Sequence, residues 1–499
     1  MSKLKIPESW SEEKIEDLAS QLGRGKSPSY SDKETGYFAI NQKCIYWNEI
    51  KLENRKPVLK NWFLSVKEDF IAKPNDILIN STGTGTLGRA CVWLDESLSG
   101  IPDTHITMLR LKSELDPKFY KYFLQSKSGQ SIIANATTGS TNQIELNKSK
   151  FGIGRVPVPP AKEQQRIVAK IESTKEKIKT IESNVEQAKA LIEKYREAIL
   201  QKAFRGQLVP QNPNDAPASK LLERIRAERD KLADPKKKKK DDLPPIKPEE
   251  IPFVIPKSWE WERLGIFAED VSYGSSSKTN ENSSGVAVLR MGNIQNGKLD
   301  FESLKYLPKN HEEFPALFLK DGDLIFNRTN SPELVGKSAI FYEKSKPFSF
   351  ASYLIRLRFA KNTILPEYVS LFINSTFGRD WANSVMIQQV GQANINGTKL
   401  KECLIPLPPT NEQKQILDRI EAEFNLIDSL EEKIESINEN TKNFVTVILS
   451  SAFSGRLVTQ NSSEGTGYDL LNKITSQQAP QKEIESKEVK ANKKKKIKK

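Results

Sequence analysis

Histidine and cysteine are scarce in this chain of 499 residues. With only two histidines, His105 and His311, general acid–base catalysis has little material to use. The three cysteines, Cys44, Cys91 and Cys403, lie far apart and show no metal-ligand spacing. An odd and sparse cysteine count is typical of a reducing compartment, so we expect a cytoplasmic protein.

Long apolar runs are missing as well. No run approaches the roughly eighteen residues that a membrane-spanning helix needs. The first ten residues lack the apolar core of a signal peptide. We therefore expect neither membrane insertion nor secretion, and the chain length predicts two to four domains.

Sequence motifs of catalytic sites occur only in incomplete form. The Gly-Lys-Ser stretches at 25–27 and 336–338 resemble the end of a phosphate loop, but serines stand where its first glycine belongs. The glycines at 83, 85 and 88 fit a dinucleotide-binding pattern, yet a strand is predicted after them where that fold needs a helix. The Asn/Asp-Pro-Pro-Tyr/Phe motif of amino-methyltransferases is absent, and Pro102-Asp103 lacks the acid-x-Lys of a nuclease. These absences favour a binding protein over an enzyme.

The net charge of +13 is weak evidence for nucleic acid. Of the 77 basic residues, eleven are lysines in two runs, at 236–240 and 493–499, which leaves 66 basic against 64 acidic residues. We interpret the runs as a solvated linker and tail that can add nonspecific, salt-dependent attraction to phosphates.

An internal repeat organises the chain, because landmarks in its first half recur 249 residues later. The register slips only between them, since 76–80 matches 323–327 at an offset of 247. The ends of fixed length indicate a scaffold, and the variable middle indicates where the copies diverge. The matching landmarks are Ile6 to Trp10 with Ile255 to Trp259, Pro157 to Pro160 with Pro406 to Pro409, Glu163-Gln164 with Glu412-Gln413, and Ala203 to Gly206 with Ala452 to Gly455.

Each copy consists of a predicted globular part and a long helix. In the globular parts, helices are expected from 117 to about 134, with Asp116 as N-cap, and from 366 to about 385. Strands followed by helices predict the α+β class. The predicted strands are 76–80, 89–94 and 105–111 in the first copy, and 323–327, 337–342 and 353–359 in the second.

Heptad patterns predict the two long helices. Apolar residues alternate at spacings of four and three from 167 to 199 and from 416 to 448, with exceptions at Glu423 and Thr441. This regularity over five heptads favours a coiled coil over an ordinary amphipathic core helix. About forty residues at ~1.5 Å each give a length of roughly 60 Å.

The ends of these helices carry their own signals. Thr410 and Gln413 fit a capping box, and Gly206 and Gly455 stand at C-cap positions. Between the copies, 219–232 predicts a short helix and 234–252 an exposed linker, and the tail from about 476 is expected to be disordered.

Glycine- and amide-rich loops occupy parallel places in both copies, at 80–89 and 137–148, and at 327–337 and 388–399. Asn, Gln and Arg can pair bidentately with base edges, whereas Ser, Thr and Lys suit phosphates, although all of them can also merely form turns. No catalytic or metal-binding residue is expected. The candidate DNA-binding residues are Thr82, Thr84, Arg89, Thr138, Ser140, Asn142, Gln143 and Lys148 in the first copy, and Arg328, Thr329, Asn330, Lys337, Gln388, Gln392, Asn394 and Lys399 in the second.

The ordered motifs resemble the specificity subunit of type I restriction–modification systems, the HsdS family. They are Ile-Pro-x-Ser-Trp opening each half, Pro-x-Pro-Pro-x-x-Glu-Gln before each long helix, Ala-Phe-x-Gly closing it, and the stretch Leu221 to Arg229. No one motif is specific, but their order, doubled over about residues 6–475, is highly specific.

The resemblance implies two target recognition domains, 1–160 and 256–409, each reading half of a bipartite site in double-stranded DNA. Antiparallel coiled-coil helices at 161–206 and 410–455 would join them with pseudo-twofold symmetry, with a connector at 207–255 and a tail at 456–499. This non-catalytic subunit would dock two modification methyltransferase subunits and restriction motor-nuclease subunits. S-adenosylmethionine, ATP and magnesium would belong to those partners, and this chain would hold no cofactor.

Two other classes of function remain open from the sequence. A coiled-coil scaffold would assemble partners without DNA, and a gel shift of the assembled complex distinguishes it from a DNA reader. A fused methyltransferase or nuclease would require activity from the isolated chain.

Overall fold

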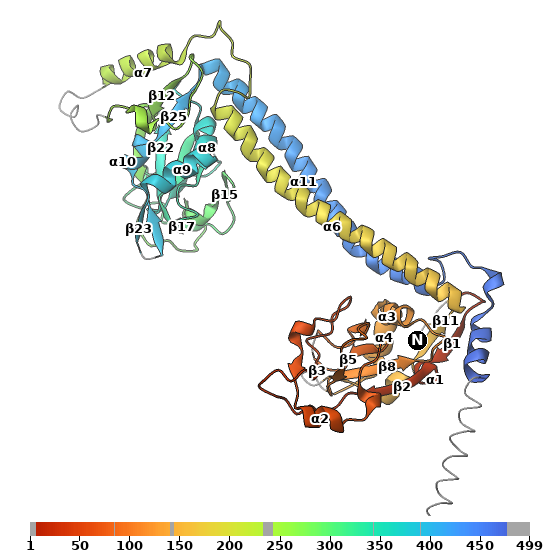
Figure 1. The fold of residues 1–499 in the computed structure, drawn as a ribbon. Helices are drawn as coiled ribbons and strands as arrows, with labels where there is room; N and C mark the ends of the chain where they lie inside the picture. The colour runs from red at the N-terminus through yellow and green to blue at the C-terminus, as the bar shows by residue number, and fades with distance from the viewer. Residues whose placement is uncertain are drawn as a thin grey trace, which may run out of the picture. The chain divides into compact units, whose positions relative to one another are not determined.

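The computed structural model describes residues 6–83, 85–139, 144–232, 243–342, 344–389 and 391–476. The chain divides into two compact units, which we call unit 1 (Met1–Val185 with Glu435–Lys499) and unit 2 (Glu186–Ile434). The division falls inside both long helices, α6 (Ala161–Phe204) and α11 (Thr410–Phe453) (Figure 1). Each unit therefore combines the globular part of one repeat with segments of both helices.

A four-stranded antiparallel sheet in the order β2-β8-β5-β6 forms the centre of the globular part of unit 1. The strands predicted at 76–80, 89–94 and 105–111 are confirmed as β5, β6 and β8, and their apolar side chains are buried except Leu111, which is partly buried. A smaller sheet, β4-β3-β7, lies in the same part, and β1 pairs with β11. The strand bounds are β1 Ser11–Lys14, β2 Ala19–Arg24, β3 Phe38–Ile40, β4 Lys56–Pro57, β5 Ile77–Asn80, β6 Ala90–Val92, β7 Gly100–Pro102, β8 Ile106–Leu111 and β11 Arg155–Val158.

Unit 2 repeats this plan with different strand lengths. Its central sheet has the order β13-β22-β18-β20, its smaller sheet the order β17-β14-β21, and β12 pairs with β25. The strands predicted at 323–327, 337–342 and 353–359 are confirmed as β18, β20 and β22. The bounds are β12 Glu260–Arg263, β13 Ala268–Tyr273, β14 Val286–Leu289, β15 Ile294–Gln295, β16 Lys298–Leu299, β17 Lys305–Leu307, β18 Asp323–Asn327, β20 Ser338–Phe341, β21 Phe348–Phe350, β22 Leu354–Phe359 and β25 Leu404–Leu407.

The single helix predicted from 117 to 134 is wrong, because the structure has two helices there, α3 (Pro117–Gln125) and α4 (Lys127–Asn135). Ser126 between them is extended, and its hydroxyl accepts a hydrogen bond from the Gly129 amide at 3.2 Å, so it starts a new helix. The second copy breaks likewise at Ser375, between α8 (Pro366–Asn374) and α9 (Thr376–Val385). The predicted N-cap is confirmed: the Asp116 carboxylate accepts from the Lys118 amide at 2.8 Å. The remaining helices are α1 Ile15–Leu18, α2 Lys60–Ser65, α5 Lys148–Gly152, α7 Ala218–Leu232 and α10 Gly397–Glu402.

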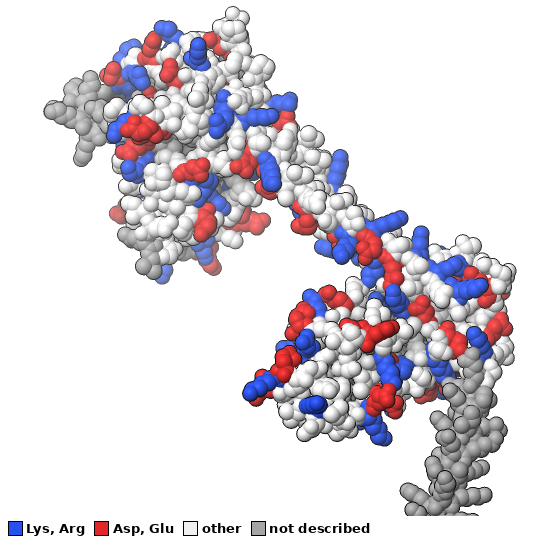
Figure 2. Space-filling model, in the orientation of Figure 1, with Lys and Arg blue, Asp and Glu red and all other residues white. Residues whose placement is uncertain are grey.

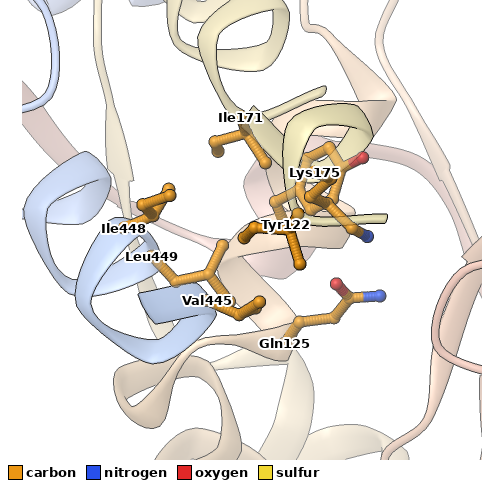
Figure 3. Close-up of a pocket in the computed structure, with 8 residues that line it drawn as sticks. Tyr122, Gln125, Ile171, Lys175, Val445, Ile448 and Leu449 are labelled. Atoms are coloured by element: carbon orange, nitrogen blue, oxygen red, sulfur yellow. The ribbon is translucent and has the colours of Figure 1, made fainter. Parts of the chain in front are cut away.

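The two long helices pair antiparallel in each unit. In unit 2, Tyr195 of α6 donates to Glu423 of α11 at 2.9 Å, and Arg196 forms an ion pair with Asp428 at 2.6 Å. In unit 1, Ile171 of α6 and Ile448 of α11 line the same packing gap (Figure 3). The coiled coil expected from the heptads is therefore present.

Beyond the first turns of the long helices, the heptad seam is fully buried at only one of its two positions. Its members at 171, 178, 185, 192 and 199 are all less than a tenth exposed, because they face the other helix or the globular part. The alternate position is buried near the helix starts, where Ile167 and Ile416 are 0% exposed. It is open farther along, where Ile181, Tyr195, Leu430, Ile437 and Phe444 are each 40–49% exposed. An apolar stripe thus remains on the helix segments of both units.

The ends of the long helices confirm one predicted signal and correct another. Gly206 and Gly455 have φ of +66° and +71°, as C-caps require, and the Gln207 amide closes the last turn on Lys202 at 2.8 Å. The capping box of Thr410 with Gln413 is wrong, because the Gln413 amide group is used elsewhere. It donates to the Pro408 carbonyl at 3.1 Å and accepts from the Leu365 amide at 3.0 Å.

Candidate DNA interface

The two predicted loops of the second copy come together as a three-stranded antiparallel ribbon in unit 2. Its strands are β19 (Thr329–Asn330), β24 (Gln392–Asn394) and β23 (Ile387–Gln389), in the order β19-β24-β23. Thr329 lies opposite Asn394, and Gln388 lies opposite Ala393. We call this element ribbon 2.

The first copy builds the same ribbon in unit 1. Thr82 bridges to Glu145, and β10 (Glu145–Leu146) pairs with β9 (Thr137–Thr138). The 247 offset aligns Thr82 with Thr329, and the 249 offset aligns Glu145 with Asn394. We call this element ribbon 1; the four residues 140–143 beside it, and Thr84, lie outside the described residues.

Polar side chains of ribbon 2 form a connected cluster. The Asn394 amide donates to the Thr329 hydroxyl at 2.7 Å and accepts from the Arg328 guanidinium at 3.4 Å. That guanidinium lies 4.7 Å from the ring centroid of Tyr273, whose hydroxyl is fixed by the Gly397 amide at 2.8 Å. Arg328, Thr329 and Asn394, all predicted from the sequence, are thus brought together.

The other predicted residues of the second copy divide into two groups. Gln388 and Gln392 are exposed on ribbon 2, and the Gln388 amide makes only a long contact, 4.0 Å, to the Met386 sulfur. Asn330 accepts from its neighbour's amide at 2.9 Å. Lys337 and Lys399 lie off the ribbon, and Lys399 already pairs with Glu402 on α10 at 3.0 Å.

The predicted residues of the first copy are less tightly linked. The Thr82 hydroxyl contacts Gln42 at 3.1 Å and the His105 imidazole at 2.9 Å. Arg89 donates to its own loop and lies over the ring of Tyr46, so it is held away from ribbon 1. Thr138 is exposed on β9, and Lys148 is exposed at the start of α5. Ser140, Asn142 and Gln143 belong to the stretch that is not described.

Sequence reasoning missed three residues: Glu145 in ribbon 1, and Arg24 and Tyr273, which contact the ribbons from β2 and β13. Arg24 forms an ion pair with Glu145 at 2.5 Å in ribbon 1, and Tyr273 supports Arg328 in ribbon 2. Arg24 and Tyr273 share the 249 offset although both precede the predicted loops. The repeat could have revealed Glu145, because Glu145 aligns with Asn394, which was predicted.

The repeated motifs serve packing in both units. In unit 2 the buried Glu412 carboxylate accepts from the Trp259 indole at 2.9 Å and from Gln211. In unit 1 the buried Glu163 accepts from Gln460 at 2.5 Å. Burial raises the pKa of both carboxyl groups. The first turn of each long helix thus forms hydrogen bonds with the segment that follows the other long helix. We call these two sets of contacts the clasps.

The hollow drawn in Figure 3 lies in unit 1, where α3 meets segments of α6 and α11. Tyr122 lies among apolar side chains of both long helices, including Ile171 and Leu449. The hollow is a gap in helix packing, and its lining lacks the convergent polar groups of a ligand site.

The described part of the chain shows no metal site, and its cysteines are buried. No group of three or more His, Cys, Asp or Glu side chains there is arranged to hold a metal ion. Burial raises the pKa of the Cys44 thiol to about 11 and also raises those of Cys91 and Cys403, so these thiols are poor nucleophiles. Among the described residues, no helix combines the length and apolarity needed to cross a bilayer.

The family model of the type I restriction modification DNA specificity domain matches the chain twice, over residues 7–189 and 256–439. The chain belongs to this family. Its role is therefore to provide DNA sequence specificity, and it is a recognition subunit without catalysis of its own.

Curated relatives and solved structures agree with this family. The chain is 26% identical over 405 residues to the type I restriction enzyme EcoEI specificity subunit of Escherichia coli, across 71% of this chain and 68% of that protein. It is 24% identical over 470 residues to the type I restriction enzyme MjaVIII specificity subunit of Methanocaldococcus jannaschii, across 90% and 94%. The HsdS subunit from Thermoanaerobacter tengcongensis matches with a TM-score of 0.60 at 16% identity, across 91% and 99%, so the fold is shared.

Proposed function

We propose that this specificity subunit reads a split site in duplex DNA, one half with each ribbon. The observation that carries the proposal is the ribbon itself, built twice in the same register with different side chains. A repeated scaffold with unequal side chains suits two half-sites of unequal sequence.

Contacts with bases and with phosphates are expected from different residues. Arg328, Gln388 and Gln392 carry groups that pair with purine edges in the major groove. Thr82, Thr138 and Lys148 suit phosphate contacts that set the register. Figure 2 shows basic and acidic side chains interspersed over the visible face, so partners would supply part of the phosphate grip.

The open apolar stripe on the long helices supports the docking of partner subunits. Exposed Ile437 and Phe444 in unit 1, and Tyr195 and Leu430 in unit 2, give each unit its own apolar surface. We infer that each surface receives one modification methyltransferase subunit, and that restriction motor-nuclease subunits join the complex. S-adenosylmethionine, ATP and magnesium would be bound by those partners, in the cytoplasm.

Coexpression with the cognate methyltransferase tests the proposal. Sequencing that detects modified bases should find N6-methyladenine at one split sequence in the host genome. Deleting this chain should abolish that pattern. Methylation that persists unchanged without the chain would reject the proposal, and a complex that shifts no DNA fragment would favour a scaffold.

A further inference from the structure

Ribbons 1 and 2 differ in charge at aligned positions. Glu145 of ribbon 1 aligns with Asn394 of ribbon 2 at an offset of 249, and so do their neighbours Arg24, at the end of β2, and Tyr273, at the end of β13. An ion pair therefore stands in ribbon 1 where ribbon 2 has an aromatic ring and an amide.

The arginine of this pair is turned toward the protein. Its guanidinium donates to the Thr104 carbonyl at 2.6 Å and to the Leu146 carbonyl at 2.8 Å, and it contacts the Glu145 carboxylate at 2.5 Å. The Arg24 side chain is 23% exposed, whereas the Glu145 side chain is 56% exposed. Arg24 is thus largely occupied, while the carboxylate is presented to solvent in a fixed position.

The fold of the ribbon does not require this acidic residue. Ribbon 2 has the same strand register, and there Asn394 turns its amide to Thr329 and Arg328. An exposed ion pair adds little stability, about 0–1 kcal/mol. A carboxylate on a DNA-facing surface also meets repulsion from phosphates, so a stabilising role explains its presence poorly.

A base edge can offer a hydrogen-bond donor to the Glu145 carboxylate, whereas a phosphate cannot. The N4 amino group of cytosine donates a hydrogen bond into the major groove, and a carboxylate accepts it. We propose that Glu145 is a specificity-determining residue that recognises a C·G pair in the half-site read by unit 1, with Arg24 as its positioning residue. This inference rests on the proposed function.

Methylation mapping with the full chain and its methyltransferase tests the inference. In Glu145→Gln the shape is kept and the charge is removed, and glutamine favours adenine. We expect one C·G position of one half-site to lose discrimination by about 5- to 150-fold, with A·T gaining there. The other half-site, which Gln392→Ala should alter, stays unchanged.

Matched variants separate positioning from stability. Arg24→Met should relax the same C·G position, whereas Arg24→Lys should restore part of the preference. Glu68→Gln removes an exposed carboxylate that pairs with Lys73 at 2.9 Å away from ribbon 1, and should leave the motif intact.

Three outcomes would overturn the inference. Unchanged base preferences in Glu145→Gln, relaxation confined to an A·T position, or equal relaxation of both half-sites would each do so. A wild-type chain that directs no split methylation would overturn the proposed function as well, which keeps the two failures distinct.

Discussion

Lys121 on α3 is a buried cation, 6% exposed, in the globular part of unit 1. Its ammonium group lies 3.7 Å from the ring centroid of Tyr122. The ammonium group of Lys175, on α6, lies 5.1 Å from the centroid of the same ring. Burial, and then repulsion by Lys175, lower the pKa of Lys121 to about 8. The ring offsets only part of the cost of burying this charge.

Lys121→Met should therefore stabilise the protein at neutral pH. Because the folded-state pKa lies below the ordinary 10.5, wild-type stability rises relative to the variant as pH increases from about 8 to 10.5. The advantage of methionine at pH 7 should be up to about 3 kcal/mol, and it should shrink over that window. Urea unfolding at pH 7, 9 and 10.5 measures both values. An advantage that does not change with pH would show that Lys121 is not the titrating group.

Gln392→Ala should alter recognition of one half-site only, because Gln392 is exposed on ribbon 2 and unit 1 has its own ribbon. Loss of one bidentate base contact costs about 1–3 kcal/mol. Competition binding with DNA altered in either half-site measures the effect. Gln295→Ala, which removes an exposed glutamine on β15 of the same unit and away from the ribbon, is the control. Equal losses at both half-sites would contradict the assignment.

The sequence predicted part of the ribbon and could not predict the rest. Arg328, Thr329 and Asn394 were found because polar residues occupied parallel loops, and they do lie together. Arg24 and Tyr273 could not be found in this way, because strand pairing brings them to the ribbon from distant positions. The direction in which Arg89 turns depends on the packing of Tyr46, which no local pattern reports.

The C-terminal phenylalanine of each long helix belongs to the other repeat's core. Phe453 of α11 packs edge-on against Phe119 and Phe123 of α3, with ring centroids 5.3 and 5.2 Å apart. Phe204 of α6 packs in the same way against Tyr368 and Phe372 of α8. The Ala-Phe-x-Gly motif is thus a packing element that the heptads alone did not explain.

Phe453→Ala should destabilise unit 1 by about 3–5 kcal/mol, the usual cost of removing a buried aromatic ring. Since the aromatic partners of Phe453 lie in the globular part of the first repeat, recognition of that half-site should weaken while the other persists. Calorimetry of the full chain and binding to split-site DNA measure the two effects. Phe444→Ala, on the exposed stripe of the same helix, should leave the unfolding of the free chain nearly unchanged. Equal loss of both half-sites would contradict this division.

Shortening both long helices by one heptad tests whether they set the gap in the recognised site. Removing 171–177 and 420–426 keeps the heptad register and takes out about 10 Å of helix. We expect a methylated site whose gap is about 3 base pairs shorter, at ~3.4 Å per pair. Deleting only one of the two segments should instead mismatch the helices and abolish methylation. An unchanged gap in the double deletion would show that the long helices do not set the distance between the half-sites.

At the scale of the whole molecule, each unit closes on the segment that follows the other repeat's helix. The Gly467 amide donates to the Ser9 carbonyl at 2.7 Å in unit 1, and the Ala218 amide donates to the Ser258 carbonyl at 2.9 Å in unit 2. The fold class was predictable from strands followed by helices and the coiled coil from the heptads, whereas the antiparallel pairing was implied only by the family resemblance. The packing of each unit against the segment that follows the other repeat's helix could not be predicted, because the sequence does not show which repeat each of these segments contacts.

A circularly permuted chain should keep its specificity. Joining residue 476 to residue 6 by a flexible linker and opening the chain between Leu232 and Leu243 leaves every contact of both clasps intact. The permuted protein should direct the same methylation motif as the original. As a control, opening the chain between Asp428 and Ser429 cuts α11 and should abolish it. A changed motif in the first permutation would show that the connector itself takes part in recognition.

Because each unit needs the segment that follows the other repeat's helix, the two units are completed in a fixed order during translation. Unit 2 ends at Ile434, so it can be complete while the last part of the chain is still being made. The globular part of unit 1 is made before unit 2, yet it lacks Phe453 and Gln460 until unit 2 has been made. A prematurely terminated chain would therefore expose the apolar face of α3, which marks it for removal before it can occupy a partner.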